Sequence, residues 1–264
     1  MRYPTLFVNH GGGPLPLLGR QPELAKHMAE TVQKWLPEKK PSAIVVLSAH
    51  WETKPVSITS SPKPGMYYDY SGFPPETYSY QYPAPGHPQL AQRIKDLFDK
   101  QGIPSQLDSK RGFDHGVFVP LMLMYPDANI PVVAVSMDAS LSVERNMAIG
   151  SALEPLRDEN ILILGSGYTF HNMHAFFHPS DQTMKQSRLF NDWLQETLAP
   201  SQTLSSILPQ LAMWEGAPGA RVCHPREEHL LPLFMTAAAA GADAHARLIW
   251  SDTNDHAVSS FMFV

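Results

Sequence analysis

The sequence predicts one α/β domain over residues 1–264, with a central mostly parallel or mixed sheet flanked by helices on both faces. Short apolar runs rich in β-branched residues, such as Ala43–Ser48, alternate along the chain with longer segments of helical periodicity. A strand, a helix and a second strand in this order favour a right-handed crossover between parallel strands. No internal repeat, low-complexity tract or linker interrupts this alternation, so a single domain is expected.

The composition indicates a globular protein with a large core, because 43% of the 264 residues are hydrophobic and only 17% are charged. The net charge of −5 argues against nucleic acid or an anionic membrane as a partner. No apolar run reaches the roughly 18 to 20 residues of a membrane span, and no signal peptide is recognised. Cys223 is the only cysteine, which excludes an internal disulfide and a cysteine-based zinc motif and fits a reducing, cytoplasmic location.

The N-terminal part of the chain supplies the first strand–helix–strand unit. Thr5–Val8 and Ala43–Ser48 are apolar runs that predict buried strands. Between them, Gln21–Leu36 carries apolar residues at every third or fourth position, which is typical of an amphipathic helix that Pro37 ends. The glycines that follow His10 allow a ligand to approach the backbone closely, but the lysine of a phosphate-binding loop is absent.

The segment Ser60–Pro88 is too long and too rich in proline for an ordinary connection. It contains seven prolines and seven tyrosine or phenylalanine residues. Long ordered loops are often binding loops, so these rings could form the wall of a pocket for a flat substrate. An equally supported interpretation is that the rings pack the loop onto the domain.

The remaining elements continue the alternation of helical periodicity and short apolar runs. The predicted strands are Pro131–Ser136, Ile161–Gly165, Ala246–Trp250 and Ser259–Val264. The predicted helices are Gln89–Lys100, a buried helix Val117–Tyr125 after the loop Gly112–Gly116, Ser142–Arg157, Met184–Leu198 and Glu227–Ala240. The segment Ser201–Arg221 has glycine and proline near its end and predicts a short helix followed by a loop.

Histidines stand at the ends of the predicted strands. His10 and His50 each follow a strand-like run, and open α/β sheets bind ligands just outside the carboxyl ends of their strands. Imidazole is a ligand for iron, zinc and copper. A third ligand could be His229 or its neighbour Glu228 in the first turns of the last helix. Adjacent helix positions point about 100° apart, so only one of these two can face a metal.

His115 and His171 lie in predicted loops after polar turns and are candidate acid or base groups. For His10 or His50 taken alone, a hydrogen-bonded structural histidine is an equally good interpretation. The other histidines carry no special spacing and are interpreted as solvated or structural. Ser48 could be a nucleophile, as could Ser166, but neither stands in a G-x-S-x-G elbow.

Six motifs follow one another in a family-specific order: NHGGGP with His10, SAHW with His50, YPAPGHP, GFDHG with His115, GSGYTFHN with His171 and EEHLLPL with His229. In this order they resemble the class III extradiol ring-cleaving dioxygenases, and most of all the DOPA 4,5-dioxygenase branch. The resemblance covers about residues 5 to 240. It implies an α/β domain with a mixed sheet and a mononuclear non-haem Fe(II), which Zn(II) can replace in a purified sample.

The resemblance also implies roles for individual residues. His10, His50 and His229 match the metal ligands of the branch, which leaves Glu228 outside the first coordination shell. His171 matches the acid/base histidine, and His115 matches a second histidine of the pocket. The chain departs from the branch at Phe118, where the branch has tryptophan, and this leaves the identity of the substrate open.

The implied reaction is the opening of a catechol ring, with a DOPA-like catechol and O2 as substrates and a muconic semialdehyde as product. Two other classes stay open. The same three histidines could bind zinc in a hydrolase that uses a metal-bound water. The chain could also be a non-enzymatic protein that binds a metal or an aromatic compound. The sequence does not specify an oligomeric state.

Overall fold

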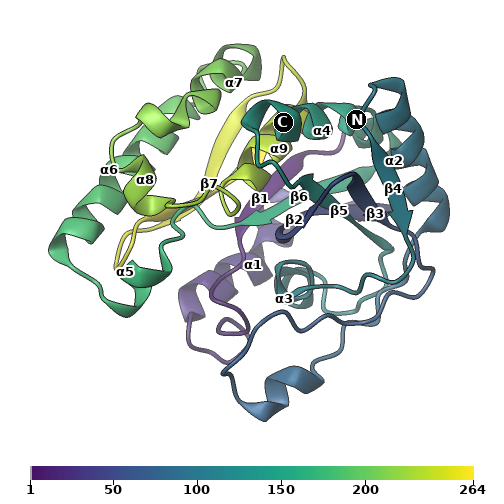
Figure 1. The fold of residues 1–264 in the computed structure, drawn as a ribbon, viewed down its shortest axis with the longest axis horizontal. Coiled ribbons are helices and arrows are strands. Elements are labelled where there is room, and N and C mark those ends of the chain that lie inside the picture. The colour runs from purple at the N-terminus through teal and green to yellow at the C-terminus, as the bar shows by residue number, and fades with distance from the viewer. Residues whose placement is uncertain (1) are drawn as a thin grey trace.

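The computed structural model describes residues 2–264 and has an α/β architecture around one eight-stranded mixed sheet (Figure 1). Its strands are β1 (Thr5–Asn9), β2 (Ala43–Thr53), β3 (Val56–Thr59), β4 (Ser105–Asp108), β5 (Val132–Asp138), β6 (Ile161–Gly167), β7 (Ala246–Asp252) and β8 (Val258–Phe263). They lie side by side in the order β4-β3-β5-β2-β6-β1-β8-β7. The fold class predicted from the sequence is therefore confirmed.

The four inner strands β5, β2, β6 and β1 are parallel to one another. Strands buried on both faces read as continuous apolar runs, and β1, β5 and β6 are buried along their whole length. The edge strands β8 and β7 run antiparallel. Because the inner strands share one direction, their carboxyl ends all meet at a single edge of the sheet.

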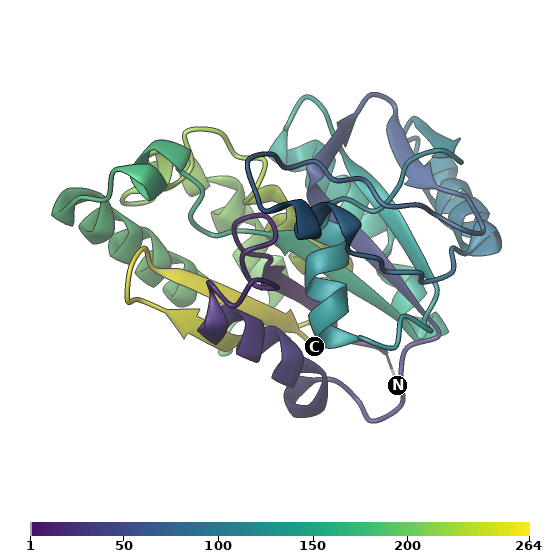
Figure 2. The same cartoon turned by 90° about the horizontal axis from the view of Figure 1, so that it is seen from below.

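Helices cover both faces of the sheet, as predicted. They are α1 (Pro22–Trp35), α2 (Pro88–Lys100), α3 (His115–Met124), α4 (Val143–Ala152), α5 (Met173–Phe177), α6 (Asp181–Thr197), α7 (Leu204–Ala212), α8 (Ala220–Cys223) and α9 (Leu231–Ala240). Helices α4 and α9 pack together on one side, whereas α1 and α3 pack on the other (Figures 1 and 2). Among the described helices, none is long and apolar enough to cross a lipid bilayer.

Two predicted helices differ from the observed ones because of proline. The helix expected over Ser142–Arg157 ends at Ala152 and gives way to a 3-10 segment over Glu154–Glu159 that includes Pro155. The helix expected from Glu227 begins only at Leu231, with proline in its first turn. The proline ring lacks an N–H and is tolerated at a helix start, so it marks where the helix begins. The strands β3 and β4 and the short helix α5 were not predicted.

Three histidines therefore lie in elements other than those predicted. His229 precedes α9 in a turn rather than lying within the helix. His115 is the first residue of α3 rather than part of a loop, because the side chain of Asp114 caps the helix by accepting a hydrogen bond from the Val117 amide. His50 lies within β2, which continues to Thr53 instead of ending at Ser48.

Candidate metal centre

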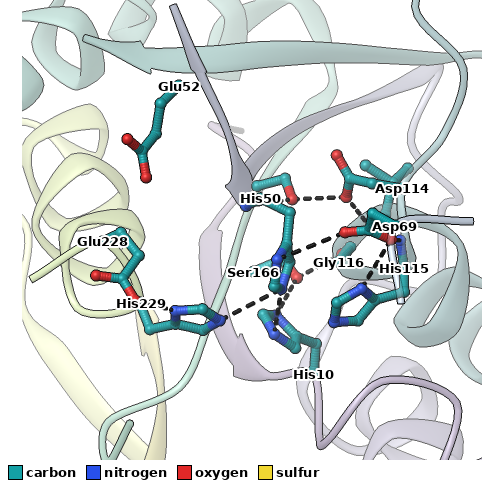
Figure 3. Close-up of polar contacts among 12 residues, drawn as sticks. His10, His50, Glu52, Asp69, Asp114, His115, Gly116, Ser166, Glu228 and His229 are labelled. Atoms are coloured by element: carbon teal, nitrogen blue, oxygen red, sulfur yellow. Dashed lines mark hydrogen bonds and ion pairs between the residues drawn. The ribbon is translucent and has the colours of Figure 1, made fainter. Parts of the chain in front are cut away.

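Five histidines meet at the carboxyl edge of the inner strands. Figure 3 shows four of them, His10, His50, His115 and His229, and the ring of the fifth, His171, stacks on that of His229. His10 directly follows β1, His50 lies near the end of β2, and His171 follows β6. His229 comes from the turn before α9, and His115 from the start of α3. The sheet edge predicted from the sequence is therefore the place where all five candidate side chains gather.

Two glycines permit this gathering. A side chain on Gly116 would collide with Ser48 and His50, so its absence lets α3 approach β2. A side chain on Gly167 would overlap the carbonyl oxygen of His229, which accepts a hydrogen bond from the Tyr168 amide at 2.9 Å. The turn that holds His229 is thereby fastened to the end of β6.

The Nε2 atoms of His10, His50 and His229 converge. The Nε2 atoms of His10 and His50 are 3.0 Å apart, and those of His50 and His229 are 3.3 Å apart. These are the three residues that the sequence predicted as metal ligands, and their nitrogens form one of three groups in the described chain that could hold a metal ion.

Hydrogen bonds on the far side of two of these rings define which nitrogen carries the proton. The hydroxyl of Ser166 donates to the Gly116 carbonyl, so it accepts from Nδ1–H of His10 at 3.0 Å. Oε1 of Glu228 accepts from Nδ1–H of His229 at 2.9 Å. With the proton on Nδ1, the Nε2 atom of a neutral imidazole presents a lone pair to the site.

The side chain of His50 has a weaker partner. Oδ2 of Asp69 lies 3.5 Å from Nδ1 of His50, within ion-pair range but beyond a good hydrogen bond. All three converging rings nonetheless have an acceptor group behind them and a second ring nitrogen in front. Histidines that bind metals in proteins are typically oriented in this way by an outer partner.

The donor set fits a metal cation. Burial lowers the pKa of His10, His50 and His229 well below the usual value, and the neighbouring imidazoles lower it further. Neutral rings place lone pairs against one another at 3.0 and 3.3 Å, which is repulsive without a cation between them. Three nitrogens that each lie about 2.1 Å from one ion stand about 3.0 to 3.4 Å apart. Imidazole nitrogens suit both Fe(II) and Zn(II).

His115 is held beside this cluster by a carboxylate from the proline-rich loop. Oδ1 of Asp69 accepts from the backbone N–H of His115 at 3.0 Å and lies 2.9 Å from its Nδ1. The His115 ring centroid is 3.8 Å from that of His50. Burial raises the pKa of Asp69, but the hydrogen bond from His115 and the neighbouring imidazoles outweigh this and lower it overall.

His171 lies against His229 and outside the three-nitrogen cluster. Its ring stacks on that of His229 with centroids 3.4 Å apart and planes at 11°. Its Nδ1 is 3.1 Å from Oε1 of Glu228. Glu228 thus contacts the Nδ1 side of His229, opposite to the converging Nε2 atom. The reason expected from the sequence, a helix that turns Glu228 away, is wrong because this stretch is a turn.

A cavity of about 500 Å³ opens beside the histidines. Its lining includes side chains of the centre and an ion pair at the rim: Ala49, His50, Glu52, His171, Arg226, Glu228 and His229. Arg226 donates to both carboxylate oxygens of Glu52, at 2.7 and 2.5 Å. Of the described residues that line this cavity, Arg226 is the only lysine or arginine.

In the segment Ser60–Pro88, the aromatic rings both border the site and pack the loop, so each of the two interpretations of its sequence applies in part. Tyr70 presents its ring edge to His115, with centroids 5.9 Å apart, and therefore borders the centre. Its hydroxyl donates to the Thr77 carbonyl at 2.6 Å, within the same loop. Tyr68 likewise donates to the Tyr80 carbonyl at 2.6 Å. The rings thus form part of a wall, and the hydroxyls hold the loop together.

Sequence reasoning missed Asp69, and it did not assign Ser166 its hydrogen bond to His10. Asp69 stands among tyrosines and is 46 residues from its partner His115, so no local pattern marks it. The serines considered as nucleophiles have structural roles. Ser48 donates to Asp114 at 2.7 Å, and Ser166 bonds as described above.

Comparisons with known proteins agree with this architecture. Residues 8–260 match the family described as the catalytic LigB subunit of aromatic ring-opening dioxygenase. The 4,5-DOPA dioxygenase extradiol of Beta vulgaris is 38% identical over 247 residues, which cover 93% of this chain and 90% of the relative. The protein of that name from Escherichia coli K12 is 36% identical over 242 residues, which cover 90% of this chain and 85% of the relative.

A crystal structure of an uncharacterized protein from Escherichia coli K12 has the same fold, with a TM-score of 0.77, 29% identity and 99% of both chains covered. The matches run through the strands and loops that deliver all five histidines, and they confirm the resemblance to class III extradiol dioxygenases. This chain belongs to the LigB family of catalytic subunits and is an aromatic ring-opening dioxygenase.

Proposed function

We propose that residues 1–264 form one catalytic domain, an Fe(II)-dependent extradiol dioxygenase that opens a DOPA-like catechol with O2 to give a muconic semialdehyde. The observation that carries this proposal is the convergence of three neutral Nε2 atoms beside two further imidazoles. His10, His50 and His229 would hold the iron, and Zn(II) suits the same donors. Both oxygen atoms of O2 enter the product, so no external reductant is needed.

When bound, the iron supplies a coordination centre that holds catechol and O2 together and polarises both. The chain supplies orientation and proton transfer around it. Ser166 and Glu228 keep the protons of His10 and His229 on Nδ1, away from the centre. His10 and His229 are buried, whereas His50 is half-buried and lines the cavity from which a substrate would approach.

His171 and His115 would handle protons and hydrogen bonds of the substrate. Nδ1 of His171 is engaged by Glu228, so Nε2 is the atom that takes a phenolic proton and later returns one. Nδ1 of His115 is engaged by Asp69, which leaves its Nε2 for a hydrogen bond to a substrate oxygen.

The cavity rim supports a substrate with a zwitterionic side chain. Glu52 and Arg226 present one carboxylate and one guanidinium, and Glu228 adds a second carboxylate. An ammonium group matches Glu52, and a carboxylate matches the guanidinium of Arg226. A catechol that carries only negative charge would meet two carboxylates and one cation. The named relatives are DOPA dioxygenases, which agrees with this preference.

A panel of four catechols tests the proposal: DOPA, dopamine, 3,4-dihydroxyphenylacetate and 4-methylcatechol. The protein is loaded with Fe(II) without oxygen and then exposed to O2, while oxygen uptake and a yellow product are recorded. We expect one O2 per product and the highest kcat/KM for DOPA. Absence of oxygen uptake with every catechol, together with ester hydrolysis by the zinc form, would overturn the dioxygenase in favour of the zinc hydrolase.

A further inference from the structure

We propose that Glu228 is a positioning residue that aims the acid/base histidine and one metal ligand at the same point through a single carboxylate oxygen. Oε1 lies 2.9 Å from Nδ1 of His229 and 3.1 Å from Nδ1 of His171. The inference rests on the acid/base role proposed for His171. It adds a residue that acts by orienting two imidazoles and not by binding the metal.

The stacking of the His171 and His229 rings shows that both rings point the same way from Glu228. The rings are nearly parallel, at 11°, and their centroids are 3.4 Å apart. In an imidazole, Nε2 lies on the ring edge opposite to Nδ1. Because both Nδ1 atoms face one oxygen, both Nε2 edges face away from Glu228. For His229 that edge meets Nε2 of His50 at 3.3 Å, so the matching edge of His171 lies beside the candidate metal position.

The carboxylate also selects the tautomer of both rings. A carboxylate only accepts hydrogen bonds, so Nδ1 of His229, which is hydrogen-bonded to it, carries a proton, and the contact with the carboxylate favours the proton on Nδ1 of His171 as well. Each neutral ring then has an unprotonated Nε2. In His229 that atom can bind a metal, and in His171 it can accept a proton. An alanine at position 228 would leave both rings free to rotate and to change tautomer.

The surroundings show that Glu228 is not a surface carboxylate that contacts histidine by chance. Its residue is 8% exposed, and among the described residues its Oε2 has no hydrogen-bond partner. The nearest cation, Arg226, is 3.5 Å away and already bound to Glu52. A carboxylate that is buried and half satisfied is costly, so packing alone does not account for it.

The backbone fixes both partners relative to Glu228. The carbonyl of His229 accepts from the Tyr168 amide at 2.9 Å, and the His171 amide donates to the Cys223 carbonyl at 2.9 Å. The side chain of Glu228 therefore joins the segment after β6 to the turn before α9. Loss of the carboxylate should disturb ring orientation while leaving the chain path intact.

The test compares Glu228→Ala and Glu228→Gln with Glu227→Gln, a neighbouring carboxylate that pairs with Arg221 at 2.8 Å and does not contact the centre. With saturating Fe(II), Glu228→Ala should lower kcat for catechol opening by about 10- to 100-fold and change KM less than about threefold. Glu228→Gln keeps one acceptor oxygen and should recover part of kcat. Glu227→Gln should behave like the parent protein.

A double-mutant cycle separates positioning from a general structural effect. In a His171→Ala background, Glu228→Ala should cost no further kcat, because its effect passes through His171. Independent kcat losses that multiply, or an unchanged kcat in Glu228→Ala alone, would overturn the proposal.

Binding of Co(II), followed by its visible absorption, supplies a readout that needs no turnover. Glu228→Ala should weaken Co(II) binding by about 10- to 100-fold with either residue at position 171. If the parent protein opens no catechol, the proposed function fails, and the Co(II) titration still reports on Glu228. Unchanged Co(II) affinity in Glu228→Ala would overturn the orientation of His229 by this carboxylate.

Discussion

The two carboxylates of the site, Glu228 and Asp69, hold their imidazoles in different ways. Glu228 serves His229 and His171 with one oxygen, at 2.9 and 3.1 Å, and the two rings are stacked. Glu228 lies one residue from His229 and belongs to a short turn. This side of the site is compact, and both rings are aimed in one direction.

On the other side, Asp69 divides its two oxygens between two rings. Oδ1 binds His115 through its ring and its backbone, and Oδ2 lies 3.5 Å from His50. The two rings are tilted by 44° and not stacked. Asp69 belongs to the long loop that also carries Tyr70. The difference teaches that one carboxylate oxygen orients two stacked rings on the Glu228 side, whereas the Asp69 side ties the long loop to His115. Under the proposed function, the first arrangement would place a proton-transfer atom and the second would connect the loop to substrate binding.

The largest expected effect is loss of the metal ion, which would affect both sides of the site. His10→Ala, His50→Ala or His229→Ala removes one of three converging nitrogens, so metal content should fall from about one ion per chain to near zero. Elemental analysis after loading measures this. His178→Ala, at an exposed position, is the control. Full metal retention by any of the three variants would remove that histidine from the candidate ligand set.

The next effect distinguishes the two sides. His171→Ala should retain the metal and lose ring opening by about 10² to 10⁴, the usual contribution of a general acid or base. His115→Ala should lose less kcat and raise KM more. Single-turnover rates and metal content measure both variants. If His115→Ala shows the larger kcat loss, the proton-transfer role belongs to the Asp69 side instead.

A third effect concerns folding on the Glu228 side. His224 is fully buried, its Nε2 contacts the Thr169 carbonyl at 2.9 Å, and burial lowers its pKa to about 3. Unfolded histidine titrates near pH 6.5, so stability is fully present above that pH and is lost as pH falls toward about 3. At pH 4, about 2.5 units below the unfolded value, the loss should reach about 3 kcal/mol.

Denaturant titrations from pH 7 to pH 4 measure this loss, and hydrogen exchange locates it. Amides after β6 and in α8 should lose protection before those of the Asp69 loop. His224→Gln cannot titrate and should flatten this part of the pH profile. An equally steep profile in that variant would assign the acid sensitivity to other groups.

The smallest effect is expected at Asp69. Asp69→Asn keeps the size of the side chain but weakens its bonds to His115, so KM for the catechol should rise by about tenfold, equivalent to about 1.4 kcal/mol. The kcat value should change little. Glu76→Gln, in the same loop and exposed, serves as the control. A kcat loss as large as that of His171→Ala would mean that the two sides share one role.

The sequence predicted the inner strands and the gathering of the histidines because buried parallel strands are continuous apolar runs. It predicted His229 as a site residue but placed it in the wrong element. An error of a few residues in the start of a helix does not change which residues lie near that start. It did not predict Asp69 as a partner of His115, or the contact between Glu228 and His171. These contacts depend on chain segments brought together by tertiary packing, and no local periodicity records such contacts. The strands β3 and β4 are only four residues each, too short for a distinct pattern.

The irregular pairing of β2 has a further consequence for His50. Between Leu47 and Glu52, β2 advances five residues while β5 advances only from Val135 to Met137. Three residues of β2 are therefore extra to the ladder, and His50 is among the residues in this interval. Side chains of a strand alternate between faces. The number of residues in this interval therefore determines which side chain faces the site. Deleting one residue before His50 would present a neighbouring side chain in its place, without any change to the histidine itself.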